Sequence, residues 1–187
     1  MQHYYRNIHG WFTYPKLYSN VIAQAKDGFH IVEVGAWKGQ STAYMGVEII
    51  NSGKSIKFDT VDTWNGSEEH LDKSCKFYEP LLEVKDGLFN HFLQNIESIK
   101  HIVNPIRMPS VEAAVLYKDE SLDFVFIDAA HDYVNVVNDI KEWLPKVKKR
   151  GVLSGHDFKH PPIHNAVFDT FGKNISSTSE DVWIYIK

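Results

Sequence analysis

The segment from Ile31 to Thr42 constrains the fold more than any other part of this chain. An apolar run ends just after Glu33, glycines follow at positions 35 and 39, and a Ser-Thr pair comes next. Such a run is typical of a buried parallel strand that leads through a tight turn into a helix, the first unit of a doubly wound α/β sheet. Ligands of these sheets bind beyond the carboxyl ends of the strands. The segment therefore predicts both an α/β fold and a ligand site at this turn.

Length and composition limit the other possibilities. The 187 residues are 43% hydrophobic and 24% charged, which predicts one globular domain over residues 1–187. A net charge of −4 argues against general binding to nucleic acid. The lone Cys75 fits a reducing compartment, and the chain shows neither a signal-peptide pattern nor an apolar run of membrane-spanning length. We therefore expect a cytoplasmic protein without a membrane partner.

The apolar segments alternate between strand-like and helix-like patterns, which favours a parallel sheet with helices on both faces. Residues 1–28 contain an aromatic-rich flap and a helix, and exposed aromatic side chains in the flap would fit a homodimer. Residues 64–86 are polar and irregular, and we expect an insertion near the ligand site. Expected strands cover 30–34, 55–61, 102–106, 122–127, 151–154, 174–177 and 182–186; expected helices cover 15–26, 41–50, 88–96, 111–116 and 163–171, with one more after residue 132.

Polar residues stand at the carboxyl ends of several expected strands. Glu33, Asp62, Asp128 and the pair His156-Asp157 each end or follow an apolar run. Because these ends lie at one edge of a parallel sheet, the side chains are expected to converge. Asp128 also begins an Asp-x-x-His sequence that ends at His131, which suits either metal binding or acid–base chemistry. The alternative is that Asp128 caps a helix and His131 lies on the surface.

Further segments carry a family resemblance. Together with the Glu33–Ser41 turn, these are Val61–Trp64, Ser121–Tyr133 and Gly151–Phe158. The chain resembles the small class I S-adenosylmethionine-dependent methyltransferases, in the branch related to macrocin and novobiocin sugar O-methyltransferases, from Trp11 to the C terminus. The resemblance implies a Rossmann-like, mostly parallel seven-stranded sheet with an antiparallel last strand. It also implies O-methylation of a small-molecule or sugar-like hydroxyl group.

The resemblance implies roles for the residues around the glycine turn. The backbone of Gly35–Gly39 would approach the methionine part of S-adenosylmethionine, and Glu33 would face its cationic end. Ser41 would cap the helix and bind the carboxylate. Asp62 would accept hydrogen bonds from the ribose hydroxyls, and Ser110 would cap a short helix and face the adenine. The expected cofactor-binding residues are Glu33, Gly35, Ala36, Trp37, Gly39, Ser41, Asp62, Thr63, Ser110 and Asp128.

The resemblance also bears on a metal ion. In metal-dependent relatives, an Asp ending the fourth strand and two Asp ending the fifth hold Mg²⁺. Asp128 and Asp157 match this pattern and are the expected Mg²⁺ ligands, but His156 replaces one acid and Ala130 another that relatives often carry. Mg²⁺ prefers oxygen ligands, so these departures weaken the metal hypothesis and make His131 the expected general base. The expected catalytic residues are therefore His131, Asp128 and Asp157.

Two alternatives stay open at this point. A nicotinamide-dependent reductase would share the α/β sheet, but its Gly-x-Gly-x-x-Gly turn differs from the Gly-x-x-x-Gly found here. A cofactor-binding module whose catalysis has decayed would explain Ala130 and His156. No motif identifies the methyl acceptor, whose contacts are expected to come from the flap and the insertion.

Overall fold

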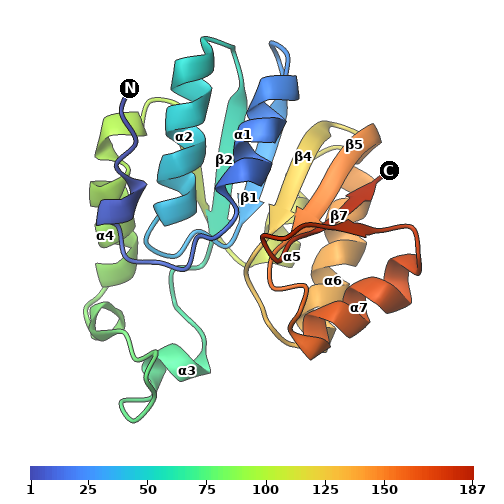
Figure 1. Ribbon diagram of the computed structural model, residues 1–187. Coiled ribbons are helices and arrows are strands. Elements are labelled where there is room, and N and C mark those ends of the chain that lie inside the picture. Colours follow the sequence, from blue (N-terminus) through green and yellow to red (C-terminus); the bar gives the residue numbers. More distant parts are fainter.

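The chain folds around one seven-stranded sheet (Figure 1). The computed structural model describes residues 1–187. The strands lie in the order β3-β2-β1-β4-β5-β7-β6; those from β3 to β5 are parallel, and β7 runs antiparallel to both β5 and β6. This confirms the predicted Rossmann-like sheet. The strands are β1 (His30–Val34), β2 (Lys57–Asp62), β3 (Val103–Arg107), β4 (Leu122–Ile127), β5 (Val147–Gly155), β6 (Ser176–Ser177) and β7 (Trp183–Ile186).

Helices cover both faces of the sheet, as expected (Figure 1). One face carries α1 (Pro15–Gln24), α2 (Gln40–Ser52) and α4 (Gly87–Asn95), and the other carries α5 (Ser110–Ala114), α6 (Tyr133–Trp143) and α7 (Pro161–Phe171). The short helix α3 (Glu68–Leu71) projects beyond the edge where the strands of the sheet end. Single 3-10 turns are η1 (Tyr5–Asn7), η2 (Pro80–Glu83), η3 (Glu97–Ile99) and η4 (Leu144–Lys146).

The two central strands, β1 and β4, are buried on both faces. Ile31 and Phe124 pack into the core under α1 and α2, whereas Val32 and Val125 pack into the core under α6 and α7. Two covered faces require a continuous apolar sequence rather than an alternating one, because successive side chains point to opposite sides. This is why these strands were predictable from sequence.

Several local expectations are wrong. Gly39 is the N-cap of α2, so Ser41 lies inside the first turn instead of capping the helix. Pro109 precedes α5 in the N-cap position, so Ser110 is the first helical residue and does not cap it. β5 begins at Val147, before the expected strand, because Val147 pairs with Leu122 at the start of β4. The insertion contains α3 and η2 and is therefore more ordered than its polar composition suggested.

The turn after β1 requires glycine at its first position. Gly35 has φ +94°, and a Cβ there would lie 2.0 Å from the carbonyl oxygen of Asp128. We expect Gly35→Ala to reduce the free energy of unfolding by about 3 kcal/mol or more, measured by urea denaturation. Gly53 is a matched control: its φ is +66° but nothing lies within 4 Å, so Gly53→Ala should cost only about 1 kcal/mol. Equal losses would show that conformation alone, not the Asp128 backbone, demands glycine.

The N-terminal segment runs along α2 before it enters α1 (Figure 1). The Gln40 side chain at the start of α2 binds this segment at two points. Its Oε1 accepts a hydrogen bond from the Phe12 backbone N–H (3.0 Å), and its Nε2 donates one to the Ile8 carbonyl (2.8 Å). The flap therefore packs against the fold next to the glycine turn. No helix in the structure combines the length and apolar character needed to cross a bilayer.

Candidate active site

Asp62 braces the glycine turn from the end of the neighbouring strand. Its Oδ2 accepts hydrogen bonds from the backbone N–H groups of Ala36 and Trp37, both 2.9 Å away. Its Oδ1 accepts from the Trp64 N–H at 2.7 Å. Trp37 and Trp64 have φ angles of +49° and +51°, which non-glycine residues seldom adopt. Asp62 thus stabilises two strained residues at the edge of the sheet where ligands bind.

Glu33 lies beneath this turn and is fully enclosed. It is 1% exposed and accepts hydrogen bonds from the hydroxyls of Tyr18 (3.0 Å), Thr42 and Thr60 (3.2 Å). Burial raises the pKa of Glu33 to about 7, although these hydroxyls and Ser41 favour the charged form. Glu33 is expected to face the cationic end of a ligand. Because it lies enclosed beneath the turn, it can do so only through a polar group between itself and the ligand.

The raised pKa of Glu33 makes stability depend on pH. A buried carboxyl that titrates near 7 instead of 4.5 favours folding at low pH and loses this advantage as pH rises from 4.5 to 7. Glu33→Gln removes the titration, so relative to wild type its free energy of unfolding should gain about 3 kcal/mol between low and high pH. Urea titrations on either side of the window test this, with the exposed Glu112→Gln as control. A pH-independent difference would contradict the assignment.

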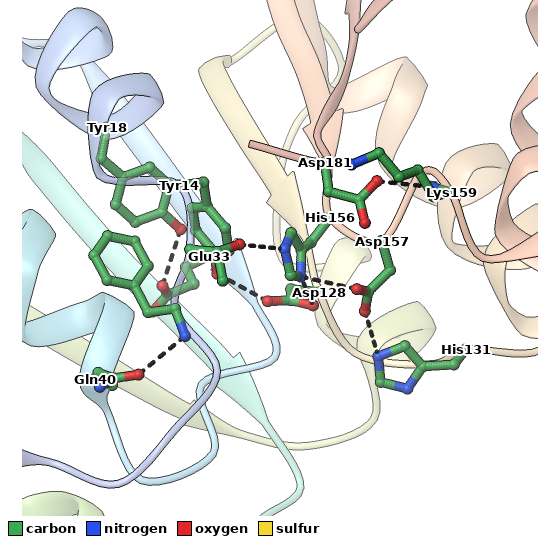
Figure 2. Close-up of polar contacts among 12 residues, drawn as sticks. Tyr14, Tyr18, Glu33, Gln40, Asp128, His131, His156, Asp157, Lys159 and Asp181 are labelled. Atoms are coloured by element: carbon green, nitrogen blue, oxygen red, sulfur yellow. Dashed lines mark hydrogen bonds and ion pairs between the residues drawn. The ribbon is translucent and has the colours of Figure 1, made fainter. Parts of the chain in front are cut away.

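The carboxyl ends of β4 and β5 bring four titratable side chains together (Figure 2). His156 is the central group: its Nδ1 lies 3.6 Å from Asp128 Oδ1 and 3.3 Å from Asp157 Oδ1. Asp157 Oδ2 accepts from Nε2 of His131 at 3.0 Å. Tyr14 donates from its hydroxyl to Asp128 Oδ2 at 2.8 Å. The predicted convergence is thus confirmed for Asp128, His156 and Asp157, and His131 joins them through Asp157.

The charges in this network shift each other's pKa. Burial lowers the pKa of His156, but hydrogen bonds and charge from Asp128 and Asp157 outweigh it and raise the value to about 10. The hydrogen bond from His131, followed by that from His156, holds the pKa of the Asp157 carboxyl well below its usual range. The same hydrogen bond to Asp157 raises the pKa of His131 above its usual value. At neutral pH, His156 is therefore a cation between two carboxylates.

His131 is the member of this network that solvent reaches most easily. Its side chain is 48% exposed, whereas that of His156 is 9% exposed. Nε2 of His131 points at Asp157, which leaves Nδ1 for another group. In its neutral form, an imidazole that donates from Nε2 carries its free electron pair on Nδ1. The Asp157–His131 pair can therefore accept a proton at the surface of the site.

The insertion is attached directly to the glycine turn. Lys38 Nζ lies 2.5 Å from Glu79 Oε2, and both side chains are nearly buried. The Trp64 indole donates to the Trp37 carbonyl (2.8 Å), and the Trp37 ring packs on His70 with centroids 4.3 Å apart. The predicted position of the insertion beside the site is consistent with these contacts.

Two of the expected cofactor residues have other partners here. The Ser110 hydroxyl accepts from the Trp143 indole at 2.9 Å and so points towards α6. Thr63 closes a local turn, in which its Oγ1 accepts from the Asn65 N–H at 3.2 Å. Adenine contacts from Ser110 and Thr63 stay predictions.

The donor set does not fit Mg²⁺ well. Ligand atoms of Asp128, His131 and Asp157 all lie within 4.8 Å of one another, a spacing that one ion could bridge. However, each carboxylate oxygen of Asp128 and Asp157 already faces a protein group: Tyr14 or His156 for Asp128, and His131 or His156 for Asp157. Mg²⁺ requires an octahedron of oxygen ligands, whereas the group between these carboxylates is an imidazolium.

Sequence reasoning missed several residues that contact this network. Tyr14 binds Asp128, Tyr18 binds Glu33, and Thr13 Oγ1 lies 2.8 Å from His156 Nε2. The spacing of four between Tyr14 and Tyr18 indicates that they share one side of a helical turn, but no local pattern pairs them with particular carboxylates. Asp128 lies 114 residues from Tyr14 in sequence, and Glu33 lies 15 residues from Tyr18.

Comparisons with known proteins agree with this geometry. A family model described as a methyltransferase domain matches residues 32–158. Among curated proteins, the uncharacterized protein y4gI of Sinorhizobium fredii (strain NBRC 101917 / NGR234) is 25% identical over 127 residues, which cover 68% of this chain. The match spans only 13% of that relative's length.

Solved structures share the fold at low sequence identity. The O-methyltransferase NovP has a TM-score of 0.69 at 14% identity, over 94% of this chain and 79% of its own. Calicheamicin methyltransferase CalS11 has 0.65 at 12%, over 91% and 76%. The O-methyltransferase from Bacillus cereus in complex with SAH has 0.60 at 18%, over 96% and 83%. These likenesses confirm the predicted fold class.

Proposed function

Because the chain belongs to the methyltransferase-domain family that matches residues 32–158, we propose that it transfers the methyl group of S-adenosylmethionine to a hydroxyl group of a small molecule. The observation that supports this best is the placement of the Asp62-braced glycine turn and the His131–Asp157 pair at one edge of the sheet. The first can bind a nucleoside, and the second can accept a proton. Methyl transfer to oxygen needs both.

The turn supplies the cofactor-binding part of this proposal. Asp62 presents a carboxylate at the end of β2, where ribose hydroxyls bind in nucleotide-binding sheets of this kind. Gly35 and Gly39 let the turn take positive φ angles (+94° and +87°) without a Cβ that would collide with the Asp128 backbone or crowd Phe92, and this turn is the backbone that would approach the methionine part of the cofactor. Asp62 holds the backbone N–H groups of Ala36 and Trp37 and so fixes the path of the turn past the ligand. The nicotinamide alternative is not favoured.

The sulfonium of S-adenosylmethionine is already an activated methyl donor, so the protein has to supply mainly a base and the alignment of the two reactants. The oxygen of the acceptor forms a bond to the methyl carbon as the carbon–sulfur bond breaks, and the electron pair stays on sulfur. The hydroxyl proton passes to Nδ1 of His131, whose Nε2 is held by Asp157. Asp128, which accepts a hydrogen bond from Tyr14, orients this pair through His156. The protein then contributes proximity and exclusion of water.

The wider setting follows the same proposal. The acceptor is a small molecule rather than nucleic acid, since the net charge is −4, and the free Cys75 suits the cytoplasm. Residues 1–187 act as one methyltransferase domain. Trp11, which is 50% exposed, is the flap aromatic available to a second copy in a homodimer. Light scattering after size-exclusion chromatography measures that state.

Two measurements test the proposal. Calorimetry should show binding of S-adenosylmethionine and not of NADH; binding of NADH alone would overturn it. A screen of hydroxyl-bearing small molecules should then find acceptors whose methylation releases S-adenosylhomocysteine. Cofactor binding without turnover of any acceptor class would instead support the decayed binding module.

A further inference from the structure

Two carboxylates that converge from neighbouring strands usually require a positive charge between them. Asp128 follows β4 and Asp157 follows β5. Asp157 has a φ angle of +53°, which a non-glycine residue keeps only where the surrounding structure holds its backbone in place. A divalent cation is one group that such a pair can hold. In this chain, the group between them is the ring of His156.

We propose that His156 takes the place of a divalent cation between Asp128 and Asp157, so that this site works without a bound metal ion. The proposal rests on the proposed function for its catalytic meaning, but not for its structural basis. It assigns His156 as a positioning residue: it holds Asp157, and Asp157 holds His131.

The surroundings of His156 favour this role over a loosely placed surface histidine. The residue is 8% exposed, and its ring packs on Tyr14 with centroids 4.8 Å apart. Nε2 meets the Thr13 hydroxyl at 2.8 Å, while Nδ1 faces both carboxylates. Both nitrogens therefore have partners, and the ring orientation is determined from two sides.

The flap contributes to the same arrangement. Tyr14 occupies the second oxygen of Asp128 and Thr13 the second nitrogen of His156, so residues from the N-terminal segment close the position from one side. His131 closes it from the other through Asp157. A hydrated metal ion would have to displace at least one of these groups to gain access to the carboxylates.

Titration with Mn²⁺, followed by calorimetry and electron paramagnetic resonance, tests this without cofactor or acceptor. Wild type should show only weak, non-stoichiometric binding, and His156→Asp should create a one-to-one site that binds Mn²⁺ at least about tenfold more tightly than that background, because an oxygen donor replaces the cation. His101→Asp makes the same substitution at an exposed position outside the network and should bind as wild type does. Thermal melting should show that Mn²⁺ stabilises His156→Asp but not wild type.

Two outcomes would overturn the proposal. One is a one-to-one Mn²⁺ or Mg²⁺ site in wild type that Asp128→Asn abolishes. The other is a folded His156→Asp variant that gains no metal affinity. If that variant does not fold, even with Mn²⁺ present, the wild-type titration still decides between the two arrangements. Calorimetry with S-adenosylmethionine in EDTA, run in parallel, shows separately whether the proposed function fails.

Discussion

His131→Ala is expected to lower kcat about 10²- to 10⁴-fold for any acceptor found in the screen, because it removes the proton acceptor. Affinity for S-adenosylmethionine should stay within about twofold of wild type, since His131 contacts Asp157 and not the glycine turn. His164→Ala, an exposed histidine on α7, is the matched control and should retain full activity. Unchanged turnover by His131→Ala would remove His131 as the base.

The same base predicts the direction of the pH dependence. Only neutral His131 accepts a proton, and its hydrogen bond to Asp157 raises its pKa above 6.5. The rate should therefore rise with pH along a limb centred above 6.5. Asp157→Asn removes the negative charge, so the limb should move to lower pH while the maximum rate falls. If the limb does not move in Asp157→Asn, the group that titrates in the rate profile is not His131.

Asp62→Asn is expected to weaken S-adenosylmethionine binding about 100-fold. The amide keeps one acceptor oxygen, so it cannot hold Ala36, Trp37 and Trp64 as the carboxylate does, and it offers the ribose less charge. Calorimetry measures the affinity, and urea unfolding shows whether the fold survives. Wild-type affinity in a folded variant would show that Asp62 only braces the turn.

Asp59→Asn separates the two effects. Asp59 lies in the same strand, β2, and accepts from Asn104, His30 and Tyr117, so its loss should reduce stability. Because these partners lie away from the glycine turn, affinity for S-adenosylmethionine should stay within about twofold of wild type. A similar loss of affinity in both variants would trace the effect to the strand.

Local sequence was enough to predict most of the fold. The apolar runs of β1 and β4 predict buried parallel strands, because a strand covered on both faces of the sheet needs apolar side chains on both sides. Helix caps were less predictable: Ser41 and Ser110 have the right residue type, but Gly39 and Pro109 occupy the N-cap positions. A cap depends on where the chain leaves the preceding strand, and that is decided by register and turn geometry.

The sequence by itself also determined which residues reach the ligand edge, because every parallel strand ends there. Asp62, Asp128 and Asp157 could therefore be predicted to lie along one edge of the sheet. Their partners were decided by tertiary structure alone: Tyr14 and Thr13 reach Asp128 and His156 only because the N-terminal segment folds back across the sheet edge. Hydrogen bonds between residues more than a hundred positions apart leave no periodic trace in the sequence. The Ile31–Thr42 turn was enough to predict a ligand site at this edge, and only the packing around His156 shows how the charges of Asp128 and Asp157 are balanced.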